Sequence, residues 1–342
     1  MFTPIPTDRL LIRAFAADDA QGLWERRNDP EVARHQNWTV PFPRDEVDTL
    51  VAELIAMDGP TNDEWWMAVV ADAITGEVYG DVALHLGSQG RIAEVGYTFA
   101  AAHWGKGYAA EAVQGLVDHL FEVVGVTRVF GMLHPDNRSS AMVLERVGFL
   151  FEGHTRLSFW LGDENSDDHI YGMIRPDWEA WRNRPRTPPS ELRLVPVAAD
   201  SSGAVLGLST HKTQEAFVAP MLDSFADALF PEVVDGAAVV PWMRAIEADG
   251  ETVGFMMVAL TTEHHPEPYL WRLLIDRVHQ RRGIASRTLD LLANELRAMG
   301  DTTVLVSWVE GKGSPDRFYL ARGFEPTGTI VDGEIEARKR LV

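Results

Sequence analysis

The chain has 342 residues, of which 46% are hydrophobic, so it is long enough to form two domains of ordinary size. It contains no cysteine, which excludes disulfides, thiolate metal sites and a cysteine nucleophile. Its 51 acidic and 31 basic side chains give a formal net charge of -20, which disfavours a nucleic-acid partner and favours cationic small molecules or basic peptide ends.

The start of the chain, MFTPIPTDRLL, has no basic segment followed by an apolar one, and no later apolar run has the length of a membrane span. We therefore expect a cytoplasmic protein with no membrane partner. A homodimer is compatible with the sequence, although no pattern in it indicates one.

The first half is predicted to begin its main sheet with a β-hairpin, because Trp65 to Leu86 form two apolar runs around a Thr-Gly-Glu turn. A further strand leads into the glycine-containing stretch AAHWGKGYAAEA, after which apolar residues recur at helical spacing from Ala109 to Phe121. A strand over Val126 to Leu133, a short helix over Ala141 to Val147 and an Arg-Val-Gly-Phe turn complete this half.

The second half repeats this order of elements. The proline-rich stretch RNRPRTPPSE predicts a linker at residues 184–190, between domains at residues 1–183 and 191–342. A hairpin over Arg244 to Leu260, a strand, the glycine signal RRGIAS, a helix, a strand and an Ala-Arg-Gly-Phe turn then follow in the same sequence. This pattern indicates an internal duplication, and each half is expected to be an α/β (α+β) domain in which helices flank a mixed central sheet.

Each glycine signal lies where a strand leads into a helix. The free N–H groups at a helix start favour an anion such as a pyrophosphate, and glycine lets it approach the backbone. The Rossmann pattern does not fit, because its third glycine is missing and several strands come first. The Walker pattern does not fit either, because Lys106 is followed by Gly107 instead of Ser or Thr.

Both stretches resemble the acetyl-CoA loop of the GNAT acetyltransferase superfamily, whose pattern is Gln/Arg-x-x-Gly-x-Gly/Ala. Gln280, Gly283 and Ala285 match all three positions. Gly107 and Ala109 match two, while Trp104 occupies the first position, as in the RimJ/RimL-like branch, where mainly the backbone amide is used. The resemblance implies that acetyl-CoA is the cofactor and coenzyme A the product.

The two halves are similar to different branches of this superfamily. Residues 7–181 resemble the RimJ/RimL type through TDRLLIRAF, EVGYTFAAAHWGKGYAAEA and HPDNRSSAMVLERVGF. Residues 191–342 resemble BltD-type polyamine N-acetyltransferases through TQEAFVAPMLDSFADAL, LWRLLIDRVHQRRG and GKGSPDRFYLARGFEPTG. The resemblance implies a tandem N-acetyltransferase whose acceptor is a primary amine of a cationic small molecule, such as a polyamine or an aminoglycoside-like antibiotic, or a peptide N-terminus. Antibiotic resistance and routine metabolic acetylation both fit this description.

Two alternatives remain at this point: one catalytic domain beside a degenerate, ligand-binding one, or a non-catalytic sensor of acetyl-CoA or an amine. The resemblance places the cofactor against the ends of two strands, the two loops and one asparagine. The implied cofactor residues are Tyr97, Thr98, Phe99, Trp104, Gly105, Lys106, Gly107, Tyr108, Ala109 and Asn137 in the first half and Leu273, Leu274, Ile275, Gln280, Arg281, Arg282, Gly283, Ile284 and Ala285 in the second.

The resemblance also implies residues for proton transfer. Glu94, on the strand before the first loop, is the expected base acting through water, with an ion pair to Arg91 as the structural alternative. Asn137 and Ser140, in an Asn-x-x-Ser pattern, are the expected pantetheine contact and thiolate acid, although both also suit a helix N-cap. Tyr319 is the expected acid of the second half, with a packing role as the alternative.

The sequence gives fewer indications of the acceptor site than of the cofactor site. The strand that matches Glu94 reads Leu270-Trp271-Arg272, so no base is apparent in the second half. Acceptor pockets are expected from the loops around Trp38 and between Gln214 and Trp242, and Trp38 is expected to stack on a flat or cationic acceptor. No metal site is expected, because the adjacent histidines before Pro266 lack partners at helical spacing.

Overall fold

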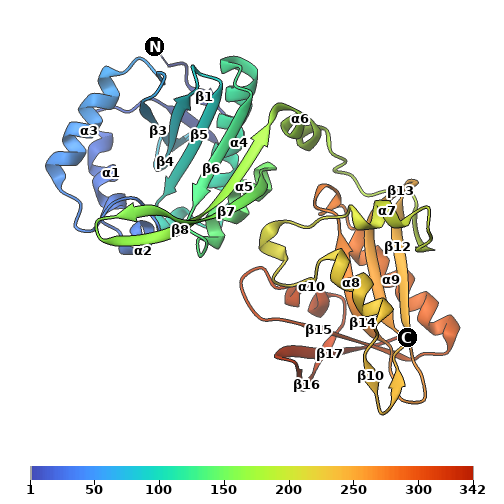
Figure 1. Cartoon of the computed structure of the whole chain (residues 1–342). Coiled ribbons are helices and arrows are strands. Elements are labelled where there is room, and N and C mark those ends of the chain that lie inside the picture. Colours follow the sequence, from blue (N-terminus) through green and yellow to red (C-terminus); the bar gives the residue numbers. More distant parts are fainter. Residues whose placement is uncertain (1, 342) are drawn as a thin grey trace. The chain divides into compact units, whose positions relative to one another are not determined.

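The structure, a computed structural model, describes residues 2–341, so the first and last residues of the predicted domain ranges lie outside it. By their internal contacts the residues form two compact units, Met1–Asn183 and Arg184–Val342 (Figure 1). Within the described part of the chain, no helix combines the length and the apolar character needed to cross a membrane.

The first unit is built on a mixed sheet whose described strands lie in the order β1-β2-β3-β4-β5-β6-β8-β7. The pair β5 and β6 is parallel, and its neighbours β4–β5 and β6–β8 are antiparallel. Figure 1 shows α1 and α3 on one side of this sheet and α4 and α5 on the other. The strands are β1 Ile5–Pro6, β2 Leu10–Arg13, β3 Trp65–Asp72, β4 Val78–Gly87, β5 Ile92–Phe99, β6 Arg128–Leu133, β7 Leu150–Leu161 and β8 Glu164–Ile174.

The helices of the first unit pack through the apolar faces that their spacing predicts. On α4, Ala112, Val113, Leu116 and Val117 are buried against the sheet. The helices are α1 Asp19–Arg27, α2 Pro30–Ala33, α3 Arg44–Ala56, α4 Tyr108–His119, α5 Arg138–Val147 and α6 Arg175–Asn183, with a 3-10 helix η1 at Ala101–His103 and a π-helix η2 at Leu120–Val124.

A buried ion pair joins α1 to the sheet. Arg26 Nη2 lies 2.9 Å from Asp81 Oδ2, and the two side chains are only 5% and 4% exposed. Because removing one partner leaves an uncompensated buried charge, we expect Asp81→Ala to lower the free energy of unfolding of the first unit by about 3–5 kcal/mol. Urea denaturation measures this loss.

The exposed pair of Arg44 and Asp48 on α3 supplies the control, because its side chains are 43% and 54% exposed. Asp48→Ala is expected to cost less than about 1 kcal/mol. If the two variants lost equal free energy of unfolding, the buried pair would contribute no more to the stability of this unit than the exposed one.

The second unit repeats the architecture with the strand order β16-β17-β15-β14-β13-β12-β9 in its described main sheet, and β14 and β15 form the parallel pair. The strands are β9 Leu192–Pro196, β10 Val233–Val234, β11 Ala237–Ala238, β12 Pro241–Ala248, β13 Glu251–Ala259, β14 Tyr269–Ile275, β15 Thr303–Trp308, β16 Glu325–Val331 and β17 Glu334–Arg340. The helices are α7 Ser202–Leu206, α8 Met221–Leu229, α9 Ile284–Met299 and α10 Asp316–Ala321, with 3-10 turns η3 Lys212–Gln214 and η4 Arg277–His279.

The two faces of this second sheet are covered by different helices. Val205 of α7 and Met221 of α8 are buried with Phe255 and Leu274 on one face, and the buried residues of α9, such as Leu292, form the core on the other. The predicted hairpins, loop-to-helix junctions and short helices are thus present in both halves, which confirms the α/β class with a helix-flanked mixed sheet in each.

The proline-rich segment at residues 184–190 is attached to the second unit. Arg282 Nε donates to the carbonyl of Thr187 at 2.8 Å, and Arg287 donates to the carbonyl of Pro189. These bonds tie residues that we predicted to be a linker to the start of α9.

Candidate active site

The junction between strand and helix has the same backbone in both units. In the first, β5 leads through η1 to α4, and Gly105 and Gly107 have φ values of 74° and 83°. In the second, β14 leads through η4 to α9, and Arg281 and Gly283 have φ values of 61° and 75°. Neither helix start has a side chain that caps it, so the first amides of α4 and α9 are available to an anion.

The residue three positions before each helix-start glycine ties the loop to the strand end. Trp104 Nε1 donates to the carbonyl of Phe99 at 2.7 Å, and Gln280 Nε2 donates to the carbonyl of Ile275 at 3.1 Å. Tryptophan and glutamine therefore make the same contact. The sequence suggested mainly a backbone role here, and the structure adds a side-chain bond that fixes the loop.

The parallel strands beside each loop diverge. The pairing of β5 with β6 covers Ile92 to Glu94, although β5 continues to Phe99. The pairing of β14 with β15 covers Tyr269 and Leu270, although β14 continues to Ile275. The strand segments after these pairs hold the backbone groups that we predicted to face the cofactor. The divergence leaves their inner edge without a neighbouring strand, and this fits an extended, amide-containing group such as the pantetheine arm of coenzyme A.

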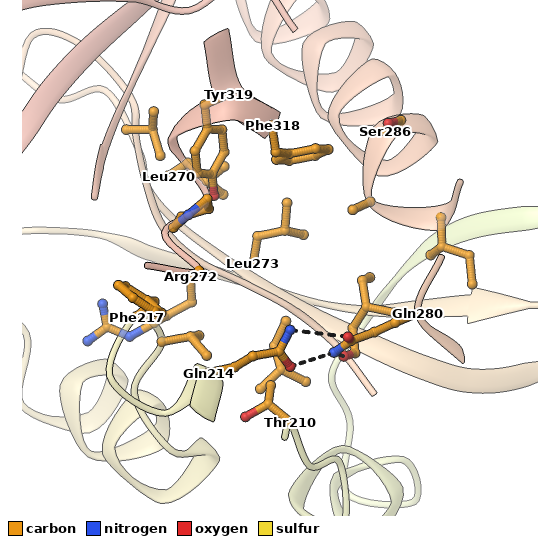
Figure 2. A pocket seen from close by; sticks show the side chains of 18 of the residues that line it. Thr210, Gln214, Phe217, Leu270, Arg272, Leu273, Gln280, Ser286, Phe318 and Tyr319 are labelled. Carbon is orange, nitrogen blue, oxygen red and sulfur yellow. Dashed lines mark hydrogen bonds between the residues drawn. The ribbon is translucent and has the colours of Figure 1, made fainter. Parts of the chain in front are cut away.

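A cavity of about 390 Å³ occupies this position in the second unit. Apart from Arg282, every residue of the second half that we predicted to bind the cofactor or to act as the acid lines it. Figure 2 shows Phe318 and Tyr319 at one end of the cavity and Gln214 at the other, where Gln214 and Gln280 exchange hydrogen bonds at 3.1 and 2.8 Å. The side chain of Arg282 is instead buried and bonded to Thr187 and His279.

Glu94 lies at the point where β5 and β6 part. It is half-buried, and its direct neighbour on β4 is His85. Burial raises the pKa of the Glu94 carboxyl, the nearby His85 lowers it and Asp168 of β8 raises it, with a net increase above the ordinary value. Arg91, the partner in the structural alternative, donates to the carbonyl of Ser88 at 2.9 Å. A raised pKa favours proton acceptance near neutral pH, and the role of Glu94 as the base stays a prediction.

Asn137 and Ser140 lie at the start of α5. Asn137 Oδ1 accepts from the backbone N–H of Ser140 at 3.2 Å, so the N-cap that the sequence allowed is formed. The hydroxyl of Tyr97 donates to the carbonyl of Ser140 at 2.8 Å, which links β5 to α5. The cofactor role of Asn137 and the acid role of Ser140 remain predictions.

Tyr319 lies in α10 and is 7% exposed. Its ring stacks on Trp308 with centroids 5.8 Å apart, and the residue lines the cavity (Figure 2). Burial raises the pKa of the Tyr319 phenol, and the charge of Glu334 adds to this increase. The phenol therefore stays protonated at neutral pH, as a proton donor to a thiolate requires.

A β-bulge changes which residue of the second unit corresponds to Glu94. The register between β13 and β14 shifts at Met257 and Val258, which inserts one extra residue into β14 at Trp271. As a result, Tyr269 faces Leu305 of β15 just as Glu94 faces Phe130 of β6. The residue that corresponds to Glu94 is therefore Tyr269, one position before the stretch Leu270-Trp271-Arg272 in which the sequence showed no base.

This comparison reveals a row of hydrogen-bonded polar side chains, Glu334, Ser307 and Tyr269, that the sequence did not indicate. Ser307 of β15, which lines the cavity, donates to the carboxylate of Glu334 and interacts with Tyr269. Trp308 pairs with Ile335 as Leu133 pairs with His169. Glu334 therefore occupies the strand position that Asp168 has in the first unit, and each unit has a carboxylate there.

Several predicted residues contact other parts of their own unit. The ring of Trp38 lies over Arg27 at 4.8 Å, and its Nε1 donates to the carbonyl of Arg27 at 2.9 Å, so the chain itself supplies a cation to this ring. Arg9 lies over Tyr108 at 4.5 Å and donates to the carbonyl of Lys106 at 3.2 Å. The roles of these residues toward an acceptor or a cofactor stay predictions.

Family models match both halves of the chain. Residues 9–150 match the model described as "Acetyltransferase (GNAT) domain", and residues 210–324 match the one described as "Acetyltransferase (GNAT) family". The chain is 26% identical over 177 residues to the uncharacterized N-acetyltransferase YoaA of Bacillus subtilis, covering 52% of this chain and 99% of that protein.

It is also 34% identical over 157 residues to the uncharacterized N-acetyltransferase p20 of Bacillus licheniformis, covering 44% of this chain and 84% of that protein. Among solved structures, the spermidine N-acetyltransferase of Vibrio cholerae in complex with CoA and spermine is similar at 21% identity and a TM-score of 0.44, covering 50% of this chain and 98% of that one. With its two matched domains in tandem, the chain belongs to the GNAT acetyltransferase family and is an N-acetyltransferase.

Proposed function

We propose that this protein transfers the acetyl group of acetyl-CoA to primary amines at two sites, one in each of the domains at residues 1–183 and 191–342. For the first domain we propose a cationic acceptor, such as a polyamine, an aminoglycoside-like amine or a peptide N-terminus. The observation that carries this proposal is the position of Glu94, a half-buried carboxylate on the last residue of β5 that pairs with β6, where the two strands part and β5 continues alone beside β4 toward the glycine loop.

The chain offers groups for each part of this reaction. Bound acetyl-CoA would supply the thioester carbonyl that the amine nitrogen attacks, so that an amide bond forms, the C–S bond breaks and the sulfur leaves as a thiolate that takes up a proton, from Ser140 in the first domain and Tyr319 in the second. An alkylammonium with a pKa near about 10.4 must first lose a proton. In the first domain Glu94, with its raised pKa, accepts that proton through water. Backbone N–H groups of β5 after Glu94 stabilise the negative charge on the oxygen.

In the second domain the corresponding groups lie around the cavity. Tyr319 would give its phenolic proton to the departing sulfur, and the proton that the nitrogen loses on forming the amide would restore the phenol. Glu334, bonded to the cavity-lining Ser307, is the carboxylate placed to receive the amine proton through Ser307 or water. This assignment supplies the base that the sequence did not reveal.

Release of free thiol from acetyl-CoA, measured with a panel of polyamines, aminoglycosides and basic peptides, tests the proposal. We expect turnover with at least one primary amine and none with its N-acetylated product. If acetyl-CoA raises the melting temperature while no amine releases thiol, the protein is a sensor of acetyl-CoA and the proposed activity is wrong.

We expect Tyr319→Phe to lower the kcat of the second domain by about 100-fold or more, because the sulfur loses its proton donor while the ring keeps its stacking on Trp308. The measurement is steady-state thiol release in a Gly107→Glu background, in which the first domain is expected not to bind acetyl-CoA. Thermal melting serves as the control for folding. Unchanged kcat in a folded variant would assign Tyr319 to packing.

A further inference from the structure

Arg272 lines the second cavity on the side of Phe217, and the carboxylate that pairs with it, Asp227, lies outside the cavity wall. Arg272 lies at the bulge of β14, and its side chain extends to the α8 side, where Nη2 lies 2.9 Å from Asp227 Oδ2. Nη1 donates to the carbonyl of Trp271 at 2.9 Å, whereas Nε is buried without a hydrogen-bond partner. Figure 2 shows Arg272 beside Phe217, on the side of the cavity away from Phe318.

The wall around Arg272 is otherwise uncharged. Thr210, Gln214, Phe217 and Val218, from the segment before α8, line this end. No Asp or Glu is among the described residues that line the cavity, and Asp227 lies outside that lining with a side chain 47% exposed. A carboxylate at this end would find the guanidinium, with its unpartnered Nε, and apolar side chains, whereas an additional ammonium group would find no carboxylate among the described residues of the cavity wall.

The first domain has a glycine at the equivalent place. Counting back three residues from the strand ends Ile275 and Phe99 gives Arg272 in β14 and Gly96 in β5. Gly96 adds no charge, and the charged groups around Glu94 are His85 and Asp168. Both domains thus have a carboxylate near this place, Asp168 in the first and Glu334 in the second, and the second domain alone adds a guanidinium, that of Arg272, where the first has Gly96.

We propose that the second domain acetylates a primary amine that also carries a carboxylate and an apolar group, with Arg272 binding the carboxylate. This inference rests on the proposed acetyl transfer and narrows its acceptor. It departs from the polyamine acceptor that the sequence resemblance implies for this half, because a polyamine would bring further positive charge to Arg272. Acetylation removes the positive charge of the amine, so the product is a net anion.

The test compares phenylalanine, 2-phenylethylamine and spermidine as acceptors for the full-length chain with Gly107→Glu. These probes share a primary amine, but only phenylalanine carries a carboxylate. We expect phenylalanine to have the highest kcat/KM. Arg272→Ala should raise its KM about tenfold or more, the effect of losing a charged hydrogen bond, and leave 2-phenylethylamine unchanged. Arg272→Lys should restore part of the loss.

Arg244→Ala is the matched control. Arg244 lies on β12, which β13 separates from β14, donates to the carbonyl of Met243 at 2.8 Å as Arg272 does to Trp271, and does not line the cavity. Equal losses in the two alanine variants, or a preference for spermidine over phenylalanine, would overturn the inference. Absence of thiol release with all three amines, while acetyl-CoA still stabilises the chain, would instead count against acetyl transfer by this domain.

Discussion

Gly283→Glu is expected to abolish cofactor binding by the second domain and leave that of the first intact, and Gly107→Glu is expected to do the reverse. The φ values of Gly107 and Gly283 are 83° and 75°, and each glycine precedes a helix start that no side chain caps. A carboxylate there repels the pyrophosphate and covers amides that would each contribute about 1.5–3 kcal/mol to an anion. Affinity for acetyl-CoA at the altered site should fall at least about 100-fold.

Isothermal titration of acetyl-CoA measures the number of sites directly. The wild type should bind one cofactor per domain, each single variant should lose one site, and the double variant should lose both. Gly283→Ala is the control, because it shares the left-handed backbone strain, about 1–2 kcal/mol, without the charge. If Gly107→Glu leaves the titration unchanged, the first domain is the degenerate partner of a single catalytic domain.

The duplicated junctions were predictable because their physics is local. A glycine with positive φ before a helix and an apolar helix face are properties of a few consecutive residues, and Gly107 and Gly283 show them directly. The sequence predicted a mixed central sheet flanked by helices in each half, whereas the strand order and the parallel central pair come from the structure. The sequence therefore indicated where acetyl-CoA is expected to bind in each half.

The acceptor ends were not predictable, because they depend on strand register. One extra residue at Trp271 moves Tyr269 into the place of Glu94, and no local pattern marks such a bulge. Glu334 and Ser307 come together only through the pairing of β15 with β17. The net charge of -20 is a property of the whole chain and does not indicate that a guanidinium, that of Arg272, lines the cavity of the second unit.

Trp38 illustrates the same limit for side chains. Its sequence context suggested a surface for a cationic acceptor, and in the structure Arg27 lies on that ring. The pKa of Arg27 is lowered, mainly because the guanidinium is buried. The cation–π contact that the residue type favours is thus formed within the chain, which a one-dimensional pattern does not distinguish from contact with a ligand.

Glu94→Gln is expected to lower the kcat of the first domain by about 100- to 10,000-fold, because an amide cannot accept the amine proton. Burial raises the pKa of Glu94, so the wild-type rate should fall as the pH drops through a value above that of an ordinary glutamate. The variant should lack this acidic limb. Thiol release in a Gly283→Glu background, followed across pH, measures both effects.

The same substitution has a predictable sign in stability. Because the folded pKa of Glu94 is raised, its contribution to stability is complete below the unfolded pKa and is lost as the pH rises through the folded pKa. Glu94→Gln should therefore raise the melting temperature of the first domain at pH 7 and change it little under acidic conditions. Glu152→Gln is the contrast, because its hydrogen bond to Arg128 lowers the pKa of Glu152. That contribution is present above the unfolded pKa, so Glu152→Gln should lower the melting temperature at pH 7. A Glu94→Gln variant that is stabilised at pH 7 yet keeps full turnover would show that Glu94 is buried but is not the base.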